Sequence, residues 1–339
     1  MTYPGGSKGR VNRAGANVRA GIASEEDHSL IQVWRAAHRP VLNTFQSLLR
    51  MRTRETTAKV AQRLKRKSTI YDKLQRERDM QLARMDDIAG CRIIFRSIKQ
   101  LRQFRKSIHE ARFNHQLRHA ENPDKYDYIA RPKPTGYRGI HDIYVYDVNS
   151  ESGAGLKGLY VEIQYRTLIQ HAWATAVEIV GVITDSQPKF QKGDPRITDA
   201  MSYASEILAR AHESMTSAHP EMPDEELVRT FLALDGELGL LESLRRLNKA
   251  KAENSESKNF ILDSAPDGSL EVHSFRDATE ALRKLFQLEQ EKPGNDIVLV
   301  RADSTDDVRL AFRNYFQDAR EFVRLVETGC ARLSGRERE

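Results

Sequence analysis

The chain has 339 residues, of which 39% are hydrophobic and 30% charged, with a net charge of +6 and a pI near 9.2. This composition can fill a core, and the length favours roughly two domains. No apolar run reaches the roughly 18 residues of a membrane span, so we expect no membrane segment. The two cysteines, Cys91 and Cys330, argue against a disulfide-stapled or cysteine-rich zinc fold and favour a cytoplasmic protein.

The N-terminal part is predicted to be a basic arm followed by helices. Residues 1–22 are basic without a long apolar stretch, so we expect a flexible arm there. Over 25–52 apolar residues recur at helical spacing, with Ser24 as the cap and Pro40 dividing the segment. Residues 31–84 carry fourteen Lys/Arg against four Asp/Glu, a bias that suits a polyanion such as nucleotide polyphosphate or RNA.

The central region is predicted to alternate strands and helices. Strands are expected at 59–64, 91–95, 113–119, 140–147 and 159–167, and helices at 68–78, 98–111 and 168–181. Such an alternation predicts an α+β or α/β fold, a mixed β-sheet flanked by helices.

The C-terminal region is predicted to hold two more helices and a small second domain. The helices are expected at 197–217 and 223–250, and the small domain pairs two strands around a Pro-Asp-Gly turn. A helix at 276–291, a strand and a last helix, opened by Ser304 and reaching about 327, complete it. The expected organisation is an arm at 1–22, a main domain at 23–220, a helix and linker at 221–257, and a β-β-α-β-α domain at 258–339.

The segment LYVEIQYRT carries the clearest candidate site. Strand alternation places Glu162, Gln164 and Arg166 on one face, opposite an apolar face. Asp87 directly precedes a buried strand, and a carboxylate there could join Glu162 in holding Mg²⁺. An Asp-Asp pair such as Asp86–Asp87 is by itself more often a turn or a helix cap.

A basic segment, RLKRKSTIYDKLQR, offers groups for phosphate binding. The helix start near Thr69 can present backbone N–H groups to phosphate, and Lys73 lies four residues further on the same helix face. Arg63, Lys65 and Arg76 add positive charge. Without further context, an ordinary basic amphipathic helix explains this pattern equally well.

Two more segments complete the set of candidates. The loop PKPTGYRG combines Lys133, Tyr137 and Arg138, and a tyrosine beside a cation can stack a base. His171 and Glu178 share a helix face in HAWATAVE. The sequence contains neither the GxxxxGK[ST] phosphate loop nor a GxGxxG pattern after a strand.

Taken in this order, four motifs within residues 55–182 resemble the synthetase domain of the RelA/SpoT family of alarmone synthetases. They are RLKRKSTIYDKL, RMDDIAGCRI, YIARPKPTGYRGIH and VEIQYRTLIQHAW. The resemblance implies an ATP-dependent pyrophosphokinase that moves the β,γ-pyrophosphoryl group of ATP onto the 3′-hydroxyl of GDP or GTP.

The resemblance also assigns roles to residues. It implies that ATP is bound by Arg63, Lys65, Thr69, Lys73 and Arg76 and that Mg²⁺ is bound by Asp87 and Glu162. Glu162 would also assist deprotonation of the acceptor hydroxyl. The acceptor would contact Lys133, Tyr137, Arg138 and His141, with support from Gln164, Arg166 and His171.

The motif variants point to a small, single-activity member, with no hydrolase domain and no long regulatory array. They are also similar to a branch of toxins that pyrophosphorylate the 3′ end of tRNA, so tRNA is the alternative acceptor. A nucleotide sensor without catalysis is a third hypothesis, which the intact acids disfavour. The C-terminal domain is expected to bind a protein regulator or to inhibit the enzyme itself.

Overall fold

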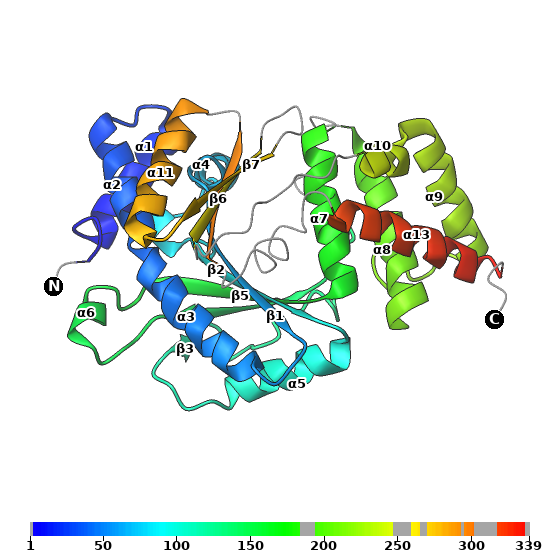
Figure 1. Cartoon of the computed structure of the whole chain (residues 1–339), viewed down its shortest axis with the longest axis horizontal. Helices are drawn as coiled ribbons and strands as arrows, with labels where there is room; N and C mark the ends of the chain where they lie inside the picture. Colours follow the sequence, from blue (N-terminus) through cyan, green and yellow to red (C-terminus); the bar gives the residue numbers. More distant parts are fainter. Residues whose placement is uncertain are drawn as a thin grey trace.

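The structure, a computed structural model, describes residues 3–183, 194–246, 259–264, 270–292, 295–301 and 317–335. Its centre is a five-stranded sheet in the order β1-β2-β5-β4-β3 (Figure 1). The strands are β1 (Lys59–Leu64), β2 (Ala89–Phe95), β3 (Gln116–Leu117), β4 (Ile140–Val145) and β5 (Tyr160–Thr167). Because β2 and β5 are parallel and the other pairs antiparallel, the sheet is mixed, which confirms the expected α+β class.

The strand expected at 113–119 is wrong in length, because only Gln116 and Leu117 pair with β4. Gln116 lies opposite Val145, the last residue of β4, so the residues before Gln116 have no strand to pair with. His115 instead accepts the backbone N–H of Asp147 on its Nδ1 atom, at 3.1 Å.

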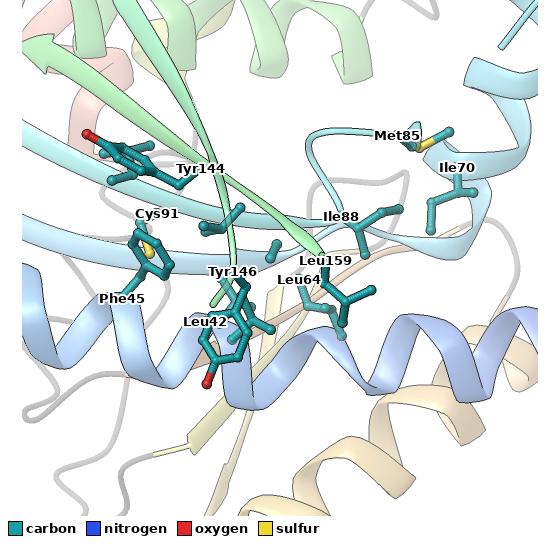
Figure 2. Close-up of a cluster of buried hydrophobic side chains, with 14 of the residues drawn as sticks. Leu42, Phe45, Leu64, Ile70, Met85, Ile88, Cys91, Tyr144, Tyr146 and Leu159 are labelled. Carbon is teal, nitrogen blue, oxygen red and sulfur yellow. The ribbon is translucent and has the colours of Figure 1, made fainter. Parts of the chain in front are cut away.

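One face of the sheet is covered by α3 (His38–Thr53) and α5 (Ile98–His109). Leu42 and Phe45 of α3 belong to one buried cluster with Cys91 of β2, and Figure 2 shows them facing the sheet. Burying each large apolar side chain of this kind stabilises the fold by about 1.5–3 kcal/mol. Since side chains alternate along a strand, burying these residues against α3 turns their neighbours in the strands to the opposite, polar face of the sheet.

The N-terminal helices differ partly from expectation. α2 (Glu25–Ala36) ends before α3, with the break at Ala37, three residues before Pro40. Ser24 caps α2 through a capping box with Asp27, as expected. This cap is local, since each side chain reaches backbone only three residues away.

Residues 8–20 form a helix, α1 (Lys8–Ala20), where the sequence predicts a flexible arm. Between its basic residues, Val11, Ala14 and Val18 form a buried apolar stripe. Gly15 lies so close to Leu82 that an added Cβ would stand 2.7 Å from the Leu82 Cβ. In the sequence this apolar stripe is short and interrupted by basic residues, so it does not predict a helix clearly. Packing against Leu82, far along the chain, stabilises the helix.

The segment between β1 and β2 holds α4 (Lys67–Arg76) and the short η1 (Leu82–Arg84), and both contact α1. The Nε atom of Arg19 in α1 donates to the carbonyl of Leu74 at 2.9 Å. A further short helix, α6 (Glu151–Ala154), precedes β5.

A bundle of helices lies at the other end of the molecule (Figure 1). It consists of α7 (Leu168–Ile183), α8 (Pro195–Glu213), α9 (Asp224–Leu238), α10 (Leu240–Arg246) and α13 (Gln317–Leu333). α13 was expected to complete the small C-terminal domain, but it packs on α7 and α8. Its buried side chains Phe322 and Val326 belong to the core of the bundle, which explains the difference.

As far as its residues are described, the small unit is a three-stranded antiparallel sheet with one helix. Its strands are β6 (Asn259–Ser264), β7 (Leu270–Phe275) and β8 (Asp296–Arg301), in the order β7-β6-β8, and its helix is α11 (Ala278–Glu291). The expected linker after 246, the Pro-Asp-Gly turn and the Ser304 cap lie outside the described residues. Among the described residues, no helix has the length and hydropathy that a membrane span requires.

The small unit contacts the N-terminal half of the chain. α11 lies beside α2 in Figure 1, and β8 contacts β1. Arg35 of α2, whose side chain is 1% exposed, pairs with Glu289 of α11 at 2.9 Å. Its Nε atom also donates to the carbonyl of Lys65, at 2.6 Å. One buried guanidinium therefore joins α11 to the end of β1.

We predict that Gly15→Val destabilises the fold by about 1–3 kcal/mol, because the added atoms overpack the contact with Leu82. Gly9→Ala is the control on the exposed side of α1, where the nearest atom to an added Cβ is the Ser7 Oγ at 3.8 Å. Urea unfolding followed by circular dichroism measures both variants. Equal stability of Gly15→Val and wild type would show that α1 is not docked.

Candidate active site

Cationic and acidic side chains share the face of the sheet that lies opposite α3 and α5. The strand register puts Arg63, Gly90 and Glu162 side by side in one row across β1, β2 and β5. Directly paired residues project to the same face. Because Gly90 has no side chain, nothing from β2 stands between Arg63 and Glu162 in this row. The arrangement leaves a space on the sheet bordered by a cation and a carboxylate.

Asp87, in the turn before β2, is held by two lysines. Lys65 Nζ lies 2.7 Å from Asp87 Oδ2, and Lys73 Nζ lies 3.1 Å from Asp87 Oδ1. Burial alone would raise the pKa of Asp87, but the charges of the two lysines hold it well below its usual range. Burial lowers the pKa of Lys65 to about 8, although the negative charge of Asp87 acts to raise it. Asp86 instead pairs with Arg118.

Glu162 is almost buried and accepts two hydrogen bonds. His141 Nδ1 donates to Glu162 Oε1 at 2.8 Å, and Gln164 Nε2 donates to Oε2 at 2.7 Å. Burial would raise the pKa of Glu162, but the charge of His141 and these hydrogen bonds lower it. The charge of Asp87 acts against this lowering. The two predicted metal ligands are therefore close enough for their charges to interact.

The hydrogen bonds of Glu162 continue into a closed ring of side chains. Tyr137 and His141 are joined through the Tyr137 hydroxyl and His141 Nε2. Arg166 Nη2 donates to the same hydroxyl at 3.1 Å and to Gln164 Oε1 at 3.2 Å. The ring thus runs through Glu162, His141, Tyr137, Arg166 and Gln164. Each member fixes the orientation of the next, so the carboxylate and the tyrosine ring are preorganised.

The charges around Tyr137 and His141 shift their ionisation in opposite directions. Burial would raise the pKa of Tyr137, but Arg166 and His141 lower it. Burial would lower the pKa of His141, but Tyr137 and Glu162 raise it. In both residues the charges of the neighbouring groups act most strongly against burial, and the hydrogen bonds add to their effect.

A pocket opens on one side of Tyr137. It encloses about 390 Å³ of empty space, including space open to solvent, and it is lined by Arg166, Trp173, Glu178 and Met201 among others. Trp173 is fixed there by a hydrogen bond from its Nε1 to the carbonyl of Met201, at 2.7 Å. Lys133 Nζ lies 5.5 Å from the centroid of the Tyr137 ring.

The structure does not bring Arg138 to this ring. Its side chain is 3% exposed and forms an ion pair with Glu213 at the end of α8. Thr167 also donates its hydroxyl to Glu213. Arg138 was expected to contact the acceptor, but its position is that of a structural ion pair between the loop and α8.

The remaining predicted residues do not belong to the ring of hydrogen bonds. Arg76 lies one turn beyond Lys73 in α4 and pairs with Glu77 at 3.4 Å. Thr69 lies in the first turn of α4 and is half-buried. His171 is buried, and burial together with Arg92 and Arg166 lowers its pKa well below the usual value.

Arg92 is a site residue that the sequence analysis missed. It is paired with Gln164 in the register, on the same face as Glu162. Burial first, and then the charge of Arg166, lowers its pKa to about 10, and Glu178 partly offsets this. The signal was present in AGCRIIF: alternation places Gly90 and Arg92 opposite the buried Cys91. The apolar run CRIIF predicts a buried strand, and a single arginine within it carries no functional signal by itself.

Residues 62–180 match a family model described as a region found in RelA / SpoT proteins. This confirms the resemblance expected for residues 55–182. Among curated proteins, GTP pyrophosphokinase YjbM of Bacillus subtilis (strain 168) is 29% identical over 170 residues, which are 49% of this chain and 74% of that protein.

Among solved structures, small alarmone synthetase 1 from Bacillus subtilis, bound to its product pppGpp, is 26% identical. It covers 52% of this chain and 90% of its own, with a TM-score of 0.45. Small alarmone synthetase 2 from the same organism is 22% identical and covers 64% of this chain and 100% of its own, with a TM-score of 0.42.

We predict that Arg138→Met destabilises the protein by about 3–5 kcal/mol, because the buried carboxylate of Glu213 loses its ionic partner. Lys133→Met removes an exposed cation from the same loop and should change stability by no more than about 0.5 kcal/mol. Guanidinium unfolding of both variants gives the comparison. Similar losses in the two would contradict the structural role assigned to Arg138.

Proposed function

We propose that this chain is a pyrophosphokinase, because residues 62–180 match the model of a region found in RelA / SpoT proteins. It transfers the β,γ-pyrophosphoryl group of ATP to the 3′-hydroxyl of GDP or GTP. The observation that carries the proposal is the pair of interacting carboxylates, Asp87 and Glu162, set among cations on one face of the sheet. The name of the similar curated protein, GTP pyrophosphokinase, supports it.

The donor nucleotide binds along the cationic side of this face. Lys65 and Lys73 neutralise phosphate charge beside Asp87, and Arg63 extends the same positive region along β1. Arg76 and the first turn of α4 around Thr69 contribute further phosphate contacts. In transfers of this kind the protein supplies position and charge neutralisation, with little covalent work.

Asp87 and Glu162 fit a magnesium ion. Mg²⁺ prefers carboxylate oxygens together with substrate phosphates, and the two carboxylates lie at the same end of paired strands, Asp87 just before β2 and Glu162 near the start of β5. Each Asp87 oxygen accepts one lysine hydrogen bond and keeps a second lone pair. Bound Mg²⁺ supplies neutralisation of the charge on the β- and γ-phosphates.

The acceptor nucleotide binds on the side of Tyr137. Its base stacks on the aromatic side chain of Tyr137, near Lys133. Arg166 holds Tyr137 and Gln164 in place through hydrogen bonds to both. Glu162 accepts a hydrogen bond from the 3′-hydroxyl and then its proton as the new bond forms. Its lowered pKa keeps it ionised at neutral pH, and His141 orients it.

We predict that Glu162→Gln lowers kcat by about 10²–10⁴-fold, because the amide cannot accept the proton. The assay follows transfer of label from γ-labelled ATP to GDP or GTP. Glu110→Gln, at the exposed C-cap position that follows α5, is the matched control and should keep full activity. Wild-type rates in Glu162→Gln would exclude the proposed role of the carboxylate.

The 3′ end of tRNA is the second candidate acceptor. The excess of Lys and Arg over residues 31–84 favours it, since a polynucleotide offers many phosphates. Offering GDP, GTP, ATP and deacylated tRNA side by side with labelled ATP separates the two acceptors. Label on tRNA alone would replace the guanosine nucleotide as the substrate.

We also propose that the small unit of β6, β7, α11 and β8 regulates the donor side, alone or with a bound protein. Arg35 supports this, since it joins Glu289 of α11 to the carbonyl of Lys65, whose side chain holds Asp87. A deletion of everything after about 255 would also remove α13 from the core of the helical bundle. A point change is therefore the sharper test.

We predict that Glu289→Gln raises kcat/KM for ATP at least threefold, because the weaker pairing with Arg35 loosens the small unit. Glu291→Gln is the control on the same helix; its carboxylate is exposed and accepts from Gln287. Steady-state kinetics with ATP as the varied substrate measures both. Unchanged kinetics in a folded Glu289→Gln protein would rule out regulation through this contact.

A further inference from the structure

One face of α8 borders the acceptor side of the site. Thr198, Met201 and Ser205 recur at spacings of three and four residues, so they share a face of the helix. Thr198 and Met201 line the pocket beside Tyr137. Ser205, one turn further along, is 2% exposed and bonds to the loop that carries Tyr137. We call this loop, residues 132–139, the acceptor loop. α8 lies outside the residues that the family model matches.

The hydroxyl of Ser205 holds the acceptor loop by its main chain. Ser205 Oγ donates to the carbonyl oxygen of Gly136 at 2.6 Å. The same Oγ lies 2.9 Å from Ser217 Oγ, and because a hydroxyl has one proton to donate, Ser217 is the donor in that pair. Ser217 also donates its backbone N–H to the buried carboxylate of Glu206 at 2.6 Å. A chain of hydrogen bonds therefore runs from Glu206 of α8 to Gly136.

Gly136 fits this contact because it has no side chain. Its φ of +86° lies in the left-handed region, and an added Cβ would stand 2.8 Å from the Cβ of Ser205 and 3.0 Å from the Cα of Ser202. The turn is closed locally, since Gly136 donates its N–H to the carbonyl of Lys133 at 2.8 Å. Lys133 donates its own N–H to the carbonyl of Tyr137 at 3.1 Å. The backbone of this turn therefore lies directly against α8.

The two residues that flank Tyr137 are both tied to α8. Gly136 is bound through Ser205, and Arg138 pairs with Glu213 at the C-terminal end of the helix. Neither contact uses the side chain of Tyr137. A side chain has only a few staggered rotamers, so a fixed main chain also fixes where an aromatic side chain can stand. The contacts with α8 therefore help to set the position of the surface on which the acceptor base stacks.

We propose that Ser205 is a positioning residue of the acceptor site, because its hydroxyl holds the Gly136 carbonyl and thereby places the side chain of Tyr137. This inference rests on the proposed pyrophosphoryl transfer and assigns part of acceptor binding to α8. The hydrogen bonds of Ser205 to described residues lead to Gly136 and Ser217, not to the lysines beside Asp87. Loss of the hydroxyl should therefore weaken use of the acceptor and not use of ATP.

Steady-state transfer from γ-labelled ATP, with Mg²⁺ and the whole chain, tests this role. The varied acceptor is the one that wild-type protein labels among GDP, GTP and deacylated tRNA. We expect Ser205→Ala to raise KM for this acceptor about 3- to 10-fold, the loss that one hydrogen bond predicts, while KM for ATP keeps the wild-type value. Ser217→Ala, which removes the donor that supports Ser205, should give a smaller increase of the same kind.

Ser202→Ala is the matched control. It removes a hydroxyl from the same helix that is also 2% exposed, but Ser202 Oγ donates within α8, to the carbonyl of Asp199 at 2.9 Å. A general effect of α8 packing would appear in this variant too. Thermal unfolding shows whether each variant is folded, and if Ser205→Ala does not fold, Ser217→Ala carries the same test.

Amide hydrogen exchange supplies a second readout that needs no substrate. Peptides from residues 133–139 should exchange faster in Ser205→Ala than in wild type or Ser202→Ala. The reason is that the N–H groups of Lys133 and Gly136 close the turn that Ser205 holds. A raised KM for the acceptor together with faster exchange in these peptides supports the inference.

The other outcomes separate this inference from the proposed function. A wild-type KM for the acceptor in Ser205→Ala overturns the inference and leaves the proposed function intact. Equal increases in KM for acceptor and ATP, or the same increase in Ser202→Ala, also overturn it, because they show a general loss of packing. A raised KM without faster exchange over 133–139 overturns the route through the acceptor loop. Label on no acceptor with wild-type protein overturns the proposed function itself.

Discussion

The parallel pairing of β2 with β5 is the constraint on which the site depends. In this register Gly90 lies beside Glu162 and Arg92 beside Gln164. Side chains alternate along a strand, so a slip by one residue would turn the whole polar row into the core and the core residues outward. Cys91 and Ile163 are buried on the face that α3 and α5 cover. Their burial therefore stabilises this register and, with it, the position of the site residues.

Charge balance explains the form of the site. Two buried carboxylates would repel one another and lose ionisation without nearby cations. Asp87 is balanced by Lys65 and Lys73, and Glu162 is held by His141 and Gln164. The surrounding arginines of β1, β2 and β5 leave a local excess of positive charge on this face. A polyphosphate supplies the negative charge that this arrangement accommodates.

Parts that are distant in sequence support the two sides of the site. On the donor side, α1 docks on α4, and Arg35 links α11 to the carbonyl of Lys65. On the acceptor side, α8 supplies Met201 to the pocket and Glu213 to the ion pair with Arg138. Both sides therefore depend for their stability on helices outside residues 62–180, the part of the chain that the family model matches.

The sequence by itself determined the features that local geometry sets. Strand alternation identified the face of Glu162, Gln164 and Arg166. The capping-box spacing of Ser24 and Asp27 identified the start of α2. Both features depend only on residues that are near neighbours in the sequence. The order of the motifs identified the region that the family model matches.

Only the tertiary structure decided which distant groups meet. It paired Arg138 with Glu213, brought Arg92 beside Gln164, docked α1 and moved α13 into the helical bundle. The physical reason is that a charged or apolar side chain takes the partner that folding brings to it, and that partner can be 75 residues away, as for Arg138 and Glu213. Residue type and spacing predict the chemistry of such a group, whereas burial and packing determine whether it serves the site or the fold.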